Sequence, residues 1–140
     1  MTRSSIALAL AIVATPLLAA PPVTDSVANR AMFERLVGIP TVLGRGKVPE
    51  LAEYLAGEYR KAGFAATDVN VVPYATTNLD GSAKDQTAAL IVHWRADKPT
   101  AKGIMLMGHM DVVEAKREDS TTDPFVLTER DGYYYGRGTI

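Results

Sequence analysis

The chain has 140 residues, of which 47% are hydrophobic and 22% charged, and its 15 Lys and Arg nearly balance its 16 Asp and Glu. This composition is typical of a globular domain with a buried core, and a net charge of -1 gives no general attraction to nucleic acid, so we expect no nucleic-acid partner. Because the chain contains no cysteine, disulfides and thiolate metal sites are excluded, and any metal must be held by His, Asp or Glu.

The first twenty residues predict a signal peptide. Arg3 gives a positive start, residues 6–18 form an apolar run, and two alanines follow at a suitable cleavage position. The run is shorter than the roughly 20 apolar residues that a bilayer span requires. We therefore expect residues 1–20 to be removed on export, with residues 21–140 periplasmic or secreted and without a permanent membrane span.

Two amphipathic helices are predicted next. Apolar residues recur at helical spacing over residues 27–37 until Gly38 ends the pattern. Pro49 suits the first turn of a second helix over residues 49–62, which Gly63 closes.

Strands are expected in the following part of the chain. Two runs of β-branched or aromatic residues, 69–74 and 88–94, flank a polar stretch at 76–84 that is typical of a loop. Residues 104–107 form a continuous apolar run between glycines, which favours a central strand buried on both faces. Such a strand would deliver His109 to its C-terminal end.

A hairpin is predicted at the C-terminal end, where residues 125–128 and 133–135 flank a turn containing Asp131 and Gly132. Helices combined with these strands predict an α/β fold class. We expect a mixed β-sheet flanked by helices.

His109 and Asp111 are the residues that indicate chemistry. They are two positions apart, and in an extended chain the side chains of such residues point to the same side. Imidazole is a common zinc ligand, and a nearby carboxylate can fix its tautomer and orientation. The pattern is short, so a hydrogen-bonded structural histidine is the alternative. His93, the other histidine, falls within a predicted strand, and we interpret it as structural.

Three linked motifs resemble a known family. Residues 107–113 (Met-Gly-His-Met-Asp-Val-Val), 123–125 (Asp-Pro-Phe) and 135–139 (Tyr-Gly-Arg-Gly-Thr) are similar in order and spacing to the M20 family of zinc metallopeptidases and related amidohydrolases. The two helices before them resemble the start of that family's catalytic domain. The resemblance therefore covers most of residues 25–140.

The resemblance implies a hydrolase with two Zn²⁺ ions that cleaves peptide or N-acyl amide bonds with metal-activated water. In it, His109 is a metal ligand, and Asp111 is the catalytic-site carboxylate that orients the imidazole. The family's bridging aspartate would directly follow Ile140, and its general-base glutamate and remaining ligands come later still. We expect residues 21–140 to be the N-terminal portion of the catalytic domain and inactive alone.

The resemblance also implies a peptide or N-acyl amino acid as substrate, and a homodimer formed through a lid domain that this sequence lacks. Glu114 departs from the family pattern, because many members have proline there, and Ser120 stands where a tryptophan is frequent. The second departure leaves substrate preference open. The alternative function is a non-catalytic exported α/β module that binds a peptide or partner without metal.

Overall fold

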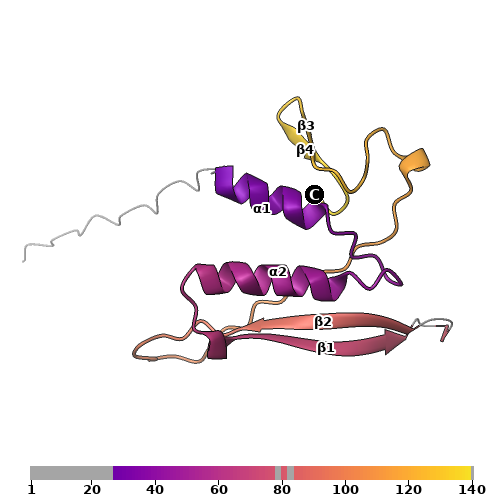
Figure 1. Ribbon diagram of the computed structural model, residues 1–140. Coiled ribbons are helices and arrows are strands. Elements are labelled where there is room, and N and C mark those ends of the chain that lie inside the picture. The colour runs from indigo at the N-terminus through magenta and orange to yellow at the C-terminus, as the bar shows by residue number, and fades with distance from the viewer. Residues whose placement is uncertain (1–26, 78–79, 82–83, 140) are drawn as a thin grey trace, which may run out of the picture.

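The computed structural model describes residues 27–77, 80–81 and 84–139 (Figure 1). The predicted signal peptide lies outside these residues. The elements are α1 (Val27–Val37), α2 (Val48–Lys61), the 3-10 helix η1 (Ala66–Asp68), β1 (Val69–Thr77), β2 (Lys84–Val92), the 3-10 helix η2 (Arg117–Asp119), β3 (Thr128–Arg130) and β4 (Tyr133–Tyr135). None of the helices in this part of the chain is long and apolar enough to cross a membrane.

Both predicted helices are confirmed. The helix α2 has proline in its first turn, where the missing N–H costs nothing, and Gly63 follows it with a φ of 96°. An ion pair of 3.1 Å between Arg35 and Glu50 joins α1 to α2.

The core lies between α2 and the strands β1 and β2, and α2 separates them from α1 (Figure 1). Ala52 and Ala56 on α2 are 0% exposed, since small side chains let the helix approach the strands closely. The other buried apolar residues of α2, β1 and β2 are Val48, Leu51, Val69 and Ala88, and the end of α1 and the segment after it add Val37, Ile39 and Val42.

β1 and β2 form an antiparallel pair that runs from Val69 opposite Val92 to Thr77 opposite Lys84. Both strands extend further toward their connection than predicted, into the stretch expected to be a loop. Backbone pairing satisfies the N–H and C=O groups of polar residues as well as apolar ones, so composition alone ended the first strand too early and began the second strand too late.

The C-terminal hairpin is also confirmed. Asp131 and Gly132 have φ values of 55° and 77°, and a tight hairpin turn of this type requires positive φ at both positions. The first strand begins at Thr128 rather than Phe125, because Phe125 donates its N–H to the Asp123 carboxylate at 2.9 Å and belongs to a turn.

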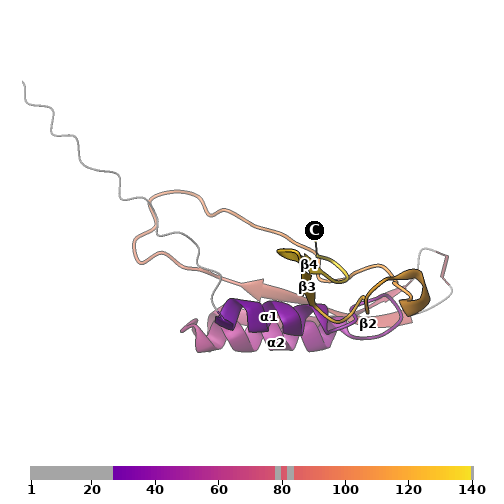
Figure 2. The ribbon, with the colours of Figure 1, turned by 90° about the horizontal axis from the view of Figure 1, so that it is seen from above.

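The predicted strand at residues 104–107 is wrong. These four side chains are 80–92% exposed, and the segment runs as coil in a wide loop away from α2 (Figure 2). A strand requires a neighbouring backbone to pair with, and no described residue provides one here.

The α/β class is confirmed, with helices packed on strands. Both described ladders are antiparallel, β1 with β2 and β3 with β4. The parallel component that the prediction of a mixed sheet required is limited, among the described residues, to the isolated bridge between Val42 and Val112.

Candidate functional site

His109 and Asp111 lie side by side in the segment that follows the exposed apolar run. The His109 Nδ1 atom is 2.8 Å from the backbone carbonyl oxygen of Asp111 and 3.3 Å from its Oδ1 atom. The sequence predicted a contact with the carboxylate, and the structure places the backbone carbonyl closer.

This geometry selects one tautomer of the His109 ring. A carbonyl oxygen can only accept a hydrogen bond, so Nδ1 must carry the proton and donate it. In the neutral ring the lone pair is then on Nε2, and Nε2 is the atom available to a metal ion or a proton donor. The ring is 83% exposed, so bulk solvent reaches it.

His109 and Asp111 border a cavity of about 360 Å³. Val48, Leu55 and Tyr59 of α2 form one wall, and residues 87–90 of β2 form another. The candidate ligand therefore faces a hollow whose remaining walls belong to the best-packed part of the molecule.

The structure brings together the three motifs that the sequence singled out. The Arg137 Nε atom donates to the Val113 carbonyl at 2.8 Å, and the Arg137 backbone N–H donates to the Pro124 carbonyl. Gly138, with a φ of 83°, lies so close to Val112 that a Cβ atom would be 3.2 Å from its Cγ1. The second glycine of the Gly-Arg-Gly motif thus permits the C-terminal segment to pack against the His109 segment.

The donor set fits one metal-ligand position. A ring with Nδ1 hydrogen-bonded to a supporting group is the usual arrangement of a ligating histidine. The described residues contain no group of three or more His, Cys, Asp or Glu that could hold a metal ion, and a catalytic zinc needs about three protein ligands. The described residues therefore offer one candidate ligand and its support, not a complete centre.

His93 lies directly after β2 rather than within a strand. Its N–H donates to the Asp68 carbonyl at 2.8 Å, while its side chain is exposed beside a shallow hollow next to Trp94. The backbone contact agrees with a structural position, and His93 belongs to no cluster of metal-binding side chains in the described part of the chain.

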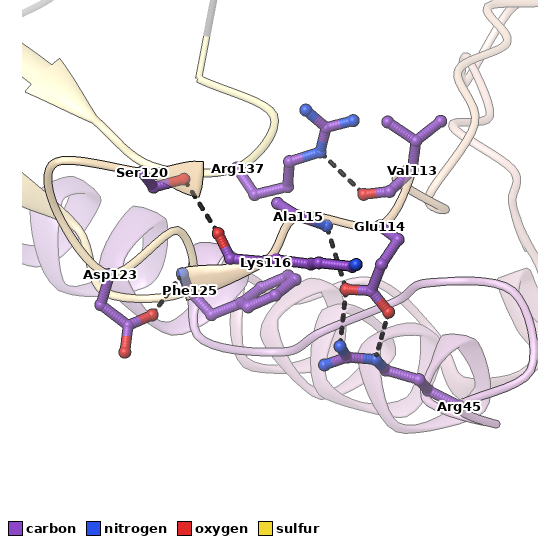
Figure 3. Close-up of polar contacts among 9 residues, drawn as sticks. All are labelled: Arg45, Val113, Glu114, Ala115, Lys116, Ser120, Asp123, Phe125 and Arg137. Carbon is purple, nitrogen blue, oxygen red and sulfur yellow. Dashed lines mark hydrogen bonds and ion pairs between the residues drawn. The ribbon is translucent and has the colours of Figure 1, made fainter. Parts of the chain in front are cut away.

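Glu114 is held by a cation from a distant loop (Figure 3). Arg45 donates from Nε to Oε2 at 3.2 Å and from Nη2 to Oε1 at 2.6 Å. These hydrogen bonds from the Arg45 guanidinium, helped by the Ala115 N–H, lower the pKa of the Glu114 carboxyl below its ordinary value.

Sequence reasoning missed the residues that hold this segment from the other side. Thr41 and Arg45, between α1 and α2, contact residues 110–114 although about 70 positions separate them. No local pattern marks either residue, because the pairing depends on how the chain folds back.

Comparisons with known proteins agree with the motif pattern. Residues 105–140 match the family model described as Peptidase family M20/M25/M40. The chain is 29% identical over 108 residues to Aminoacylase-1 of Sus scrofa, covering 76% of this chain and 24% of that protein. It is 29% identical over 119 residues to an N-fatty-acyl-amino acid synthase/hydrolase of Homo sapiens, with 83% and 22% covered.

A third relative is Acetylornithine deacetylase of Erwinia tasmaniensis, 28% identical over 113 residues, with 77% of this chain and 26% of that protein covered. The chain thus spans about a quarter of the length of these relatives. No solved structure matches it significantly. The family match includes His109, Asp111 and the Gly-Arg-Gly motif, and three relatives align with most of the chain, so the comparisons support the resemblance of this chain to the M20 family of peptidases and amidohydrolases.

Proposed function

We propose that the protein carrying this chain is a zinc-dependent hydrolase of amide bonds in N-acyl amino acids or short peptides. The names of its relatives support this substrate class, since they describe an aminoacylase, an N-fatty-acyl-amino acid hydrolase and a deacetylase. The observation that carries the proposal is the His109 ring, whose Nδ1 faces two oxygen atoms of Asp111 and whose Nε2 is left available.

In this proposal, His109 holds a zinc ion through Nε2, and Asp111 keeps the ring in the required tautomer. The metal supplies Lewis-acid activation of water and of the amide carbonyl when it is bound. The other ligands and the general base belong to sequence outside the described residues. We therefore also propose that residues 21–140 alone do not hydrolyse amides, and that the protein is exported behind residues 1–20.

The test uses the full-length protein and the variant His109→Ala. We expect zinc content to fall by one ion or more per chain and hydrolysis of N-acetyl amino acids to fall by at least about a hundredfold, because one ligand of a catalytic metal is removed. Metal content is measured by atomic spectroscopy and hydrolysis by release of the free amino acid.

The matched control is His93→Ala, which removes the other histidine from an exposed position directly after the end of β2. It should keep both zinc and activity. Unchanged zinc and unchanged hydrolysis in His109→Ala would overturn the proposal.

The alternative is a non-catalytic binding module. It is supported by the cavity of about 360 Å³ beside His109, which residues of α2 and β2 line. A full-length protein that binds no zinc and hydrolyses no amide, yet binds peptides into the cavity beside His109, would establish this alternative.

A further inference from the structure

Thr41 holds the backbone on both sides of Asp111. Its side chain is almost completely buried, with the residue 2% exposed, and Oγ1 donates to the Met110 carbonyl at 2.7 Å. Its own carbonyl accepts the Val112 N–H at 3.2 Å. One residue of the α1–α2 connection therefore fixes the positions immediately before and after the carboxylate that faces His109.

The connection that carries Thr41 is itself anchored. The buried Asp85 carboxylate on β2 accepts the Gly44 N–H at 2.6 Å. Ile39 and Val42, on either side of Thr41, are 3% and 5% exposed. Residues 39–44 are therefore attached to the core and can serve as a fixed support.

A second attachment lies further along the same two segments (Figure 3). Arg45 forms two hydrogen bonds with Glu114, and its guanidinium lies 5.2 Å from the centre of the Phe125 ring. On the other side of the backbone, Arg137 donates to the Val113 carbonyl. Residues 110–114 are thus held at both ends by contacts from elsewhere in the fold.

The chain just before His109 offers no comparable support. Residues 104–107 are 80–92% exposed and pair with no strand in the described part of the molecule. The orientation of the His109 ring therefore depends on the contacts that follow it, above all on the two made by Thr41.

We propose that Thr41 is a positioning residue for His109. By fixing Met110 and Val112, it keeps the carbonyl and carboxylate of Asp111 against Nδ1 and so keeps Nε2 available. The two hydrogen bonds that join Thr41 to Met110 and Val112, which we call the Thr41 tether, do not depend on any metal. Their effect on zinc binding, in contrast, rests on the proposed function. The two parts need separate measurements.

The variants are Thr41→Val, which keeps the shape and removes the hydroxyl donor, and Thr41→Ser, which restores the donor. Val69→Ala is the matched control, because Val69 is equally buried, at 2%, but lies on β1, where it pairs with Val92 and its carbonyl accepts a hydrogen bond from Arg60. It should lower stability without disturbing the tether. All variants are made in the full-length protein and compared where each is folded.

The first measurement needs no metal. The ¹⁵N chemical shifts of the His109 ring report which nitrogen carries the proton, and we expect Thr41→Val to move them toward a mixture of tautomers. Thr41→Ser and Val69→Ala should keep the wild-type shifts. Unchanged ring shifts in Thr41→Val, or the same change in Val69→Ala, would overturn the positioning role.

The second measurement is the affinity for Zn²⁺ alone, determined by competition with a chelator. Loss of supporting contacts around a metal ligand commonly weakens binding about 10- to 100-fold, and we expect this for Thr41→Val. Thr41→Ser should recover affinity to within about threefold, and Val69→Ala should match the wild type. Wild-type affinity in Thr41→Val would contradict the inference, while failure of the wild type itself to bind zinc would refute the proposed function and leave the ring shifts to judge the tether.

Discussion

Two sets of apolar residues in this molecule have opposite surroundings, those on the inner face of α2 and those at positions 104–107. Leu51, Ala52 and Ala56 on α2 are buried against β1 and β2. Residues 104–107 are all apolar, and every one of them is exposed. The difference is the presence of a partner surface, since burial removes apolar area from water only where another face is available to cover it.

The candidate site stands between these two regions. It follows the exposed run directly in sequence, yet its backbone is attached through Thr41 and Asp85 to the well-packed region. Its order therefore derives from the core rather than from the segment that precedes it. Substitutions can test this contrast at three levels.

The largest effect is expected from shortening one leucine in each region. Leu51→Ala should lower the free energy of unfolding by about 2–4 kcal/mol, because it removes buried methyl groups and leaves a cavity. Leu106→Ala should change it by less than about 0.5 kcal/mol, because Leu106 is 92% exposed. Urea denaturation of the 140-residue chain measures both. An equal cost at the two positions would show that residues 104–107 are buried in solution.

An intermediate effect is expected where the C-terminal motif meets the site. Gly138→Ala places a side chain at a φ of 83° and 3.2 Å from Val112, and a residue with a Cβ in this conformation costs about 1–2 kcal/mol. The same denaturation experiment measures the loss. Gly103→Ala is the control, because a Cβ there meets no atom within 4 Å, and its effect should stay within about 0.5 kcal/mol.

The smallest effect is expected from the Arg45–Glu114 pair. Arg45 lowers the pKa of the Glu114 carboxyl in the folded chain. The pair therefore stabilises the fold at pH values above 4.5, the ordinary pKa of this carboxyl, and this contribution is lost as the pH falls through the lowered pKa. Glu114→Gln should therefore lower stability at neutral pH and become indistinguishable from the wild type in acid.

Thermal unfolding at a series of pH values checks this expectation. Because both side chains are substantially exposed, the difference should be small and should shrink at high salt. Glu118→Gln, in the exposed turn η2, is the control. A difference that grows toward acid pH would contradict the assigned role of Glu114.

Local patterns predicted much of the fold. Apolar spacing predicted both helices, and a proline in the first turn further indicated where α2 begins. Asp131 and Gly132 predicted the hairpin turn. Each of these signals acts within a few residues. The run at 104–107 misled the prediction, since hydrophobicity indicates a preference for burial and says nothing of the partner.

The candidate site divides in the same way. The His-x-Asp spacing and the Gly-Arg-Gly motif identified His109 and Asp111 as candidates, and their place within the family match supports looking for chemistry there. Whether His109 binds a metal stays a prediction. The use of the Asp111 carbonyl, the glycine contact with Val112 and the support from Thr41 could not be predicted.

The sequence by itself determined which segments form helices and hairpins, because backbone rotation and side-chain shape act between neighbouring residues. It also determined which side chains have atoms that can bind a metal or exchange a proton, because these atoms belong to the residue type. Only the tertiary structure decided which tautomer His109 adopts and which distant residue holds its segment. Those outcomes depend on hydrogen bonds between atoms that are about 70 residues apart in the chain, and such bonds exist only after the core has brought the two segments together.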